Sequence, residues 1–309
     1  MGAHALAAHA ASDAAARIRH ASGEAPQLHM HNPISYLAPL ALAGLAFAFA
    51  QPVAANGSPT VRMASLGFVR AQLTATVISE NGYQHLALNR LRILRAGRAA
   101  FDAKLPEQES SDYQPAFTGA DLLQVRQLGR GNEPAVIVQV YTGGAHCCTR
   151  TALYWYDPPA RRYRVVERDW GNGGYALKNL EPYDAVPEFV TSDQAFAYAF
   201  ASYAGSGRPL QVLRFRRGAF VDVTGCYPKL IAAEAQRFWQ SALQQRAAPY
   251  GEPNGVLAPY VADQYLLGRG PAAWQRLDQF PSADAKFRAD LRKLLTGSGY
   301  IGAPSPNCA

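Results

Sequence analysis

The residues with the clearest chemical potential are His146, Cys147 and Cys148, which are consecutive in the chain. Thiolates beside an imidazole suit soft metal ions such as Cu(I) or Zn(II), and a thiol near a histidine can act as a nucleophile. In a strand, alternation places His146 and Cys148 on one face and Cys147 on the other, so that only a turn brings all three together. The cluster could form a metal-handling or thiol-redox centre, but a purely structural role is the simpler interpretation.

Four cysteines allow three disulfide connectivities. Cys226 ends the strand-rich region and Cys308 is the penultimate residue, so we expect a bond between them to fasten the C-terminal tail. That pairing leaves Cys147 and Cys148 for each other, across a single peptide bond. A strained bond of this kind is easily reduced and would suit a switch, although a structural role is the simpler interpretation.

Other polar or aromatic stretches are weaker candidates. The glycine-rich segment 169–175 (DWGNGGY) would suit a sugar or an anion, but a turn that needs positive φ explains it more simply. In the segment 196–203 (FAYAFASY), strand alternation predicts one packed face between sheets. Arg214, Arg216 and Arg217 are expected at a solvated edge. No motif for a serine nucleophile, a phosphate loop, a dinucleotide or a zinc protease occurs after residue 55, so enzymatic activity is uncertain and less expected than binding.

These residues lie among predicted strands. The stretch Val136–Asp157 is rich in β-branched and aromatic residues on both sides of Gly143-Gly144, which favours two strands joined in a hairpin. Further strands are predicted at Leu73–Ile78 and Leu86–Leu94. Strands therefore dominate residues 60–228.

Three stretches in this region share one pattern: an apolar strand, a turn with arginine, and an aromatic residue that opens the next strand. The aromatic residues Phe101, Tyr163 and Phe220 are spaced by 62 and 57 residues, and Pro134 and Pro187, each before an apolar strand, are 53 apart. Such a period predicts a propeller-like array of antiparallel blades, incomplete or small, in a mainly β protein.

This frame resembles the bacterial FG-GAP (integrin-alpha-like) repeat proteins, over about residues 85–228. The family's blades carry an aspartate-rich calcium loop followed by Pro-Glu and a strand. Here the loop at 127–133 has no aspartate, and the second loop offers Asn179, Glu181 and Asp184. The resemblance implies blade-like sheets and an exported location, whereas a calcium site at these three residues is only a minor expectation.

The N-terminal part predicts export. No Lys, Arg, Asp or Glu occurs between Glu24 and Arg62, and the apolar run Tyr36–Ala50 has the length of a signal-peptide core. We expect cleavage before Asn56, so residues 1–55 are an N-terminal extension and signal peptide, with translation starting at Met1 or at Met30. An uncleaved anchor helix is the alternative for residues 30–55.

The C-terminal part predicts a helical unit. Apolar residues at helical spacing indicate a helix over Lys229–Ala248 and another over Leu257–Leu267, closed by Gly268. Pro271 is expected to open a third helix, and Ser282 to cap a fourth that ends at Gly297. The predicted domains are residues 56–228, β-rich, and 229–309, helical.

Composition limits the functional classes. The net charge is +7 and the pI about 9.3, but the basic residues are scattered, which disfavours a nucleic-acid footprint. We expect an exported, non-catalytic binding module of the bacterial cell envelope, periplasmic or secreted. It would contact a protein or an envelope polymer and have no nucleic-acid partner, no cofactor and no stable membrane span after signal cleavage. The alternative is the metal-handling or thiol-redox protein centred on His146, Cys147 and Cys148.

Overall fold

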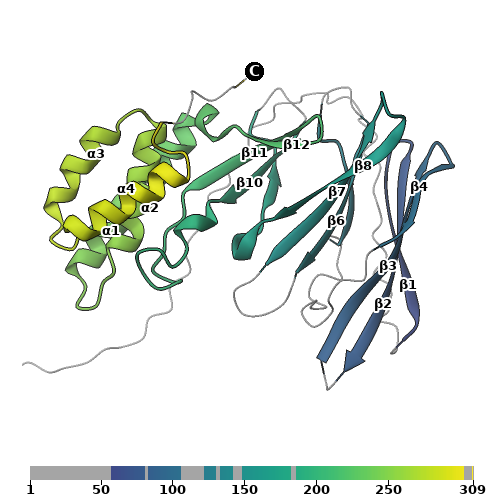
Figure 1. The fold of residues 1–309 in the computed structure, drawn as a ribbon, viewed down its shortest axis with the longest axis horizontal. Helices are drawn as coiled ribbons and strands as arrows, with labels where there is room; N and C mark the ends of the chain where they lie inside the picture. The colour runs from purple at the N-terminus through teal and green to yellow at the C-terminus, as the bar shows by residue number, and fades with distance from the viewer. Residues whose placement is uncertain are drawn as a thin grey trace, which may run out of the picture. The chain divides into compact units, whose positions relative to one another are not determined.

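A computed structural model of the chain describes residues 57–80, 83–105, 122–129, 133–141, 148–181, 186–302 and 308. Its strands form three antiparallel sheets of four strands each, and in every sheet the strands follow one another in chain order (Figure 1). The first sheet contains β1 (Pro59–Leu66), β2 (Val69–Glu80), β3 (Tyr83–Arg95) and β4 (Arg98–Lys104). The second contains β5 (Leu123–Arg126), β6 (Ala135–Tyr141), β7 (Thr149–Asp157) and β8 (Arg162–Asp169). The third contains β9 (Ala176–Lys178), β10 (Glu188–Ser192), β11 (Leu210–Arg216) and β12 (Ala219–Asp222).

The predicted internal repeat corresponds to equivalent positions in the three sheets. Phe101, Tyr163 and Phe220 all lie in the fourth strand of their sheets. The turns before these strands contain Ala96, Arg161 and Arg217, which have φ values of 47°, 52° and 49°. A residue in the left-handed backbone region suits a tight hairpin turn. The turn pattern that the three stretches share in sequence therefore corresponds to the same backbone conformation in all three turns.

The second sheet contributes side chains to two hydrophobic cores, one on each of its faces. Successive side chains of a strand point to opposite faces, so neighbouring residues enter different cores. On β6, Val136 and Val138 pack into a core shared with the first sheet, around Leu73 and Leu91. The intervening Ile137 packs into a second core, shared with β10 and β11 of the third sheet. The apolar run Ala135–Val138 of β6 therefore reflects an inner strand of its sheet, with a neighbouring sheet on each side.

A polar contact also joins the first two sheets. Glu133 accepts hydrogen bonds from the Arg95 Nε atom at 2.5 Å and from the Tyr163 hydroxyl at 2.6 Å. Burial, followed by the bond to Glu133, raises the pKa of Tyr163 above its usual range.

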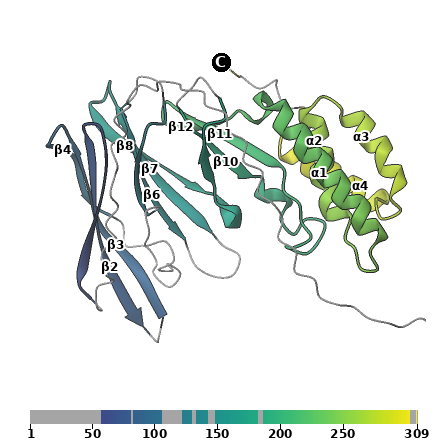
Figure 2. The same ribbon diagram turned by 180° about the vertical axis from the view of Figure 1, so that it is seen from behind.

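Helices follow the strands, as the sequence predicted. They are α1 (Pro228–Ala247), α2 (Asn254–Leu266), α3 (Gly270–Arg276) and α4 (Ala285–Gly297), and Figures 1 and 2 show them packed side by side. Short 3-10 turns occur at 171–173, 194–196, 224–226 and 277–279. No helix among the described residues is long and apolar enough to cross a membrane.

The cap of α4 differs from the prediction. Asp284, not Ser282, is the N-cap, and its carboxylate accepts a hydrogen bond from the Phe287 amide at 2.8 Å. The Ser282 hydroxyl instead donates to the Asn254 side chain at 2.9 Å. Serine and aspartate both suit an N-cap position, and in the fold Ser282 is used for the contact with Asn254 at the start of α2.

The segment 196–203 is not a strand, so the predicted face of alternating aromatic residues is wrong. Residues 194–196 form a 3-10 turn, and turns follow. Phe196 is 2% exposed in the helical core and packs on Tyr300, and Phe200 packs on Phe287 of α4. These residues join the β region to the helices rather than one sheet to another.

The mainly β fold with a C-terminal helical region is therefore confirmed. None of the three sheets is closed on itself, and a propeller stays a prediction.

Candidate functional site

The predicted metal or thiol centre is only partly within the described residues. His146 and Cys147 lie outside them, while Cys148, just before β7, is buried and disulfide-bonded. The predicted hairpin strands on either side of this segment are present as β6 and β7, which pair in antiparallel register. The pairing of Cys147 with Cys148 stays a prediction.

The minor calcium set is not brought together within the described part of the chain. Asp184 lies outside that part, Asn179 is exposed, and Glu181 is 3.9 Å from the Arg214 guanidinium. Nowhere in the described ranges do three or more His, Cys, Asp or Glu side chains group as metal ligands do.

A disulfide joins Cys226 to Cys308, with 5.5 Å between their Cα atoms. Cys226 closes the 3-10 turn between β12 and α1, so the bond attaches the end of the chain to the point where strands give way to helices. No cysteine among the described residues is free.

The glycine-rich segment 169–175 is a turn whose aromatic residues belong to the core. Gly171 and Gly174 have φ values of 61° and 58°, as the turn interpretation requires. Trp170 is 2% exposed, stacks on Phe189 with ring centroids 5.3 Å apart, and donates its Nε1 hydrogen to Thr151. A buried indole has no face left for a sugar, so the packing role accounts for this residue.

Arg214 departs from the expected solvated edge. Its guanidinium binds the fully buried Glu188 carboxylate at 2.6 and 2.8 Å, and the Tyr227 hydroxyl donates to the same carboxylate at 2.9 Å. Burial, followed by Glu188, raises the pKa of Tyr227 to about 12. The sequence signal that could have revealed this pair is Glu188 itself, an acidic residue at the start of the apolar strand after Pro187. A charge buried there needs a partner of opposite charge.

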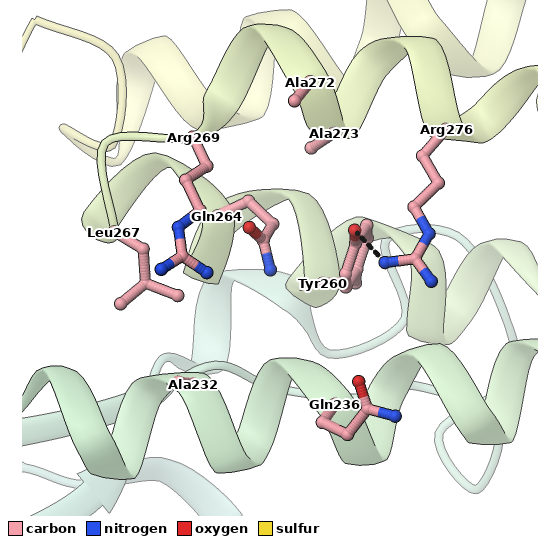
Figure 3. Close-up of a pocket in the computed structure, with 9 residues that line it drawn as sticks. All are labelled: Ala232, Gln236, Tyr260, Gln264, Leu267, Arg269, Ala272, Ala273 and Arg276. Carbon is pink, nitrogen blue, oxygen red and sulfur yellow. Dashed lines mark hydrogen bonds between the residues drawn. The ribbon is translucent and has the colours of Figure 1, made fainter.

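The best candidate site is a cavity of about 320 Å³ among α1, α2 and α3. Most of its walls come from side chains at helical spacing: residues 232 and 236 on α1, 260 and 264 on α2, and 272, 273 and 276 on α3, with Arg269 at the N-cap of α3. Positions separated by three, four or seven residues lie on one face of a helix, so each helix turns one face to the cavity. The lining side chains are Ala232, Gln236, Tyr260, Gln264, Leu267, Arg269, Ala272, Ala273 and Arg276 (Figure 3).

A tight connection sets α3 against the cavity. Gly268, with φ of 72°, ends the α2 segment, and α3 starts at Gly270. A Cβ atom on Gly270 would lie 2.5 Å from the Tyr265 ring, so only glycine lets the start of α3 approach α2 this closely. Arg269, between these glycines, therefore reaches the cavity at one end of α3.

Arg276 is positioned at the other end of the cavity. Its guanidinium lies 3.8 Å from the centroid of the Trp239 ring and donates to the Tyr260 hydroxyl at 3.3 Å. Within the described residues, neither Arg276 nor Arg269 forms an ion pair with a carboxylate. Both arginine residues are exposed, so their charges are accessible from solvent.

The polar groups that line the cavity suit the binding of a ligand. They are two guanidinium groups, two amides and one phenol, and the lining includes no carboxylate, imidazole, thiol or aliphatic hydroxyl. General acid–base or nucleophilic chemistry needs groups of those kinds close together. Cationic donors around small apolar side chains instead suit the recognition of an anion.

A second cavity, of about 290 Å³, lies between β3 and the second sheet, where Leu88 faces the strands β6, β7 and β8. Charged residues line it too, but Arg150 binds the Asp169 carboxylate at 3.2 Å. Because Glu167 adds a further negative charge, this cavity has no comparable excess of positive charge.

Sequence reasoning missed the α3 cavity. It predicted the helices and the Gly268 and Pro271 signals, but it did not single out Arg269 and Arg276. The two arginine residues are seven positions apart in a segment without an acidic residue, and this is the signal that could have drawn attention to them.

A family model and two curated proteins are similar to parts of the chain. A family model described as the sll0997 C-terminal domain matches residues 231–299. The probable thylakoid lumen protein sll0997 of Synechocystis sp. (strain ATCC 27184 / PCC 6803 / Kazusa) is 35% identical over 160 residues, which are 50% of this chain and 47% of that protein. The uncharacterized protein y4bJ of Sinorhizobium fredii (strain NBRC 101917 / NGR234) is 26% identical over 209 residues, 55% of this chain and 30% of that protein.

The chain thus spans less than half the length of these curated relatives. No solved structure matches it significantly. Every residue that lines the α3 cavity lies within residues 231–299, so the part of the chain that carries the cavity is similar to the sll0997 C-terminal domain.

Proposed function

We propose that this protein is an exported, non-catalytic binding protein that works in the periplasm or outside the cell. The observation that carries the proposal is the α3 cavity, which has binding groups and a lining without a catalytic set. In this proposal the helical region holds a small ligand, and the three sheets, as blade-like units of an open array, contact a protein or an envelope polymer.

Two further observations support an extracytoplasmic location. A disulfide such as Cys226–Cys308 persists in oxidising compartments. The relative from Synechocystis is named as a probable thylakoid lumen protein, and its similarity supports a comparable, non-cytoplasmic compartment for this chain.

The test is to isolate the full chain from its own host after fractionating cytoplasm, periplasm and culture medium. Native mass spectrometry then compares the wild type with Ala272→Leu, which fills the cavity from an exposed position. We expect the protein outside the cytoplasm, with its N-terminus near Asn56, and a small molecule bound to the wild type but not to the variant. A cytoplasmic protein with its N-terminal segment intact would contradict the proposal.

A thiol-redox role is the second candidate, because Cys148 is both disulfide-bonded and next to the His146-Cys147 pair. Graded reduction followed by alkylation tests it. In a redox protein, Cys148 is alkylated at reductant concentrations that leave Cys226 and Cys308 protected. Simultaneous alkylation of all three would remove this candidate.

A further inference from the structure

The two arginine residues of the α3 cavity define what kind of ligand fits there. Arg269 is the N-cap of α3 and Arg276 is its last residue, so the length of the helix, about 10 Å at 1.5 Å per residue, separates their backbones. Figure 3 shows the two guanidinium groups extending from opposite ends of α3 toward α2, with Gln264 and Tyr260 between them. The cavity therefore has a positive charge at each end.

The space between the two charges is neutral. Ala272 and Ala273 form one wall, and Ala232 and Gln236 of α1 lie across from them (Figure 3). Alanine side chains leave room for a methylene chain, whereas the Gln236 and Gln264 amides supply uncharged donors and acceptors. A ligand that matches this order has anionic ends and a short apolar middle.

We propose that the cavity binds an α,ω-dicarboxylate, an unbranched organic dianion with one carboxylate at each arginine. A guanidinium group binds a carboxylate through two parallel hydrogen bonds, and Arg276 is already oriented by Trp239 and Tyr260. A cavity of about 320 Å³ is at the small end of ligand sites, which suits a molecule of this size. A single inorganic anion would engage one end only. The inference rests on the proposed function, since it names the ligand class of the same cavity.

The experiment is isothermal titration calorimetry of the full chain with adipate, with shorter and longer homologues (succinate and suberate) to find the best length. Hexanoate has one anionic end, 1,6-diaminohexane has two cationic ends, and inorganic phosphate is a compact anion. We expect adipate to bind about tenfold more tightly than hexanoate, because the second charged contact is lost, and we expect no binding of the diamine.

Variants assign the binding to the cavity. Arg269→Gln and Arg276→Gln should each weaken adipate binding about tenfold or more, and Ala272→Leu should abolish it. Arg292→Gln is the matched control, because Arg292 lies on α4 over the Trp274 ring and outside the cavity. It should bind adipate as the wild type does. Arg276→Lys, which keeps the charge without the planar fork, covers the case in which the Arg276→Gln variant folds poorly.

Equal affinity for adipate and hexanoate, or adipate binding that survives both Arg→Gln substitutions, would overturn the dicarboxylate assignment. So would an absence of adipate binding to the wild type at millimolar concentration. If the exported protein nevertheless carries a neutral or cationic molecule that Ala272→Leu loses, the ligand class is wrong and the proposed binding function stands. If it carries no ligand and adipate does not bind, both fail.

Discussion

At the scale of single residues, Asp263 is the most unusual group. Its side chain is fully buried in α2, and neither carboxylate oxygen has a hydrogen-bond partner among the described residues. Burial, followed by the nearby Glu234 charge, raises the pKa of Asp263 to about 9, although Arg237 acts in the opposite direction. The group is therefore protonated at neutral pH, because a buried unpaired charge is costly.

This shift predicts a pH dependence of stability. Between the ordinary pKa of 3.8 and about 9, the folded protein holds a proton that the unfolded chain releases. Stability should therefore fall as the pH rises through this window, by roughly 1 kcal/mol per pH unit from this group. Asp263→Asn removes the titration, so urea denaturation from about pH 5 to about pH 8 should give a flatter curve than the wild type, with a more stable variant at the upper end.

The control is Asp278→Asn, which breaks the exposed pair with Arg288. Its curve should run parallel to that of the wild type. Parallel curves for wild type and Asp263→Asn would show that Asp263 is ionised in the folded state.

Glu188 is also a buried acid, but unlike Asp263 its carboxylate has hydrogen-bond partners. Arg214 and Tyr227 bind it, and the Leu180 amide donates to it at 3.0 Å. Glu188→Gln leaves the largely buried Arg214 charge with only the longer contact to Glu181, at 3.9 Å. We expect a loss of about 3 to 5 kcal/mol in the free energy of unfolding.

The matched substitution is Asp290→Asn, which removes the exposed pair with Lys286 and should cost less than about 0.5 kcal/mol. Denaturant titration monitored by tryptophan fluorescence compares the two. Equal small losses would mean that the Glu188 network adds no stability.

At the scale of elements, two residues at the start of α4 have different roles: Asp284 caps the helix, whereas Ser282 contacts Asn254 of α2. Asp284→Ala removes the side chain that accepts from the Phe287 amide, and should lower stability by about 1 kcal/mol. Ser282→Ala loses only the exposed bond to Asn254 and should cost less than about 0.5 kcal/mol. Thermal unfolding of both variants checks this order, and a larger loss for Ser282→Ala would restore Ser282 as the cap.

At the scale of the whole molecule, the Cys226–Cys308 disulfide closes a loop of 82 residues around the helical region. In the chain-entropy account such a loop contributes about 4 to 5 kcal/mol by restricting the unfolded state. The double variant Cys226→Ser, Cys308→Ser should therefore lose stability of this order in urea without added reductant. Its secondary structure by circular dichroism should match that of the wild type, because the sheets and helices have cores of their own. A loss below about 1 kcal/mol would argue against that account.

Several features could be predicted from the sequence alone because neighbouring residues encode them. Alternating β-branched and aromatic residues specified β6 and β7, and the shared turn pattern pointed to equivalent strands around Phe101, Tyr163 and Phe220. Helical spacing and the Gly268 and Pro271 signals located the C-terminal helices within a few residues.

Only the tertiary structure decided how these elements use their side chains. Phe196 and Phe200 have the alternation of a strand, yet Phe200 contacts Phe287 of α4 and Phe196 contacts Tyr300, just after that helix. Arg214 looked solvated until the fold placed Glu188 beside it, and the α3 cavity exists only where three helices meet. Periodicity and turn chemistry act over a few residues, so the sequence determined the strands and helices. Burial and charge pairing depend on which distant segments meet, and for that reason the site required the structure.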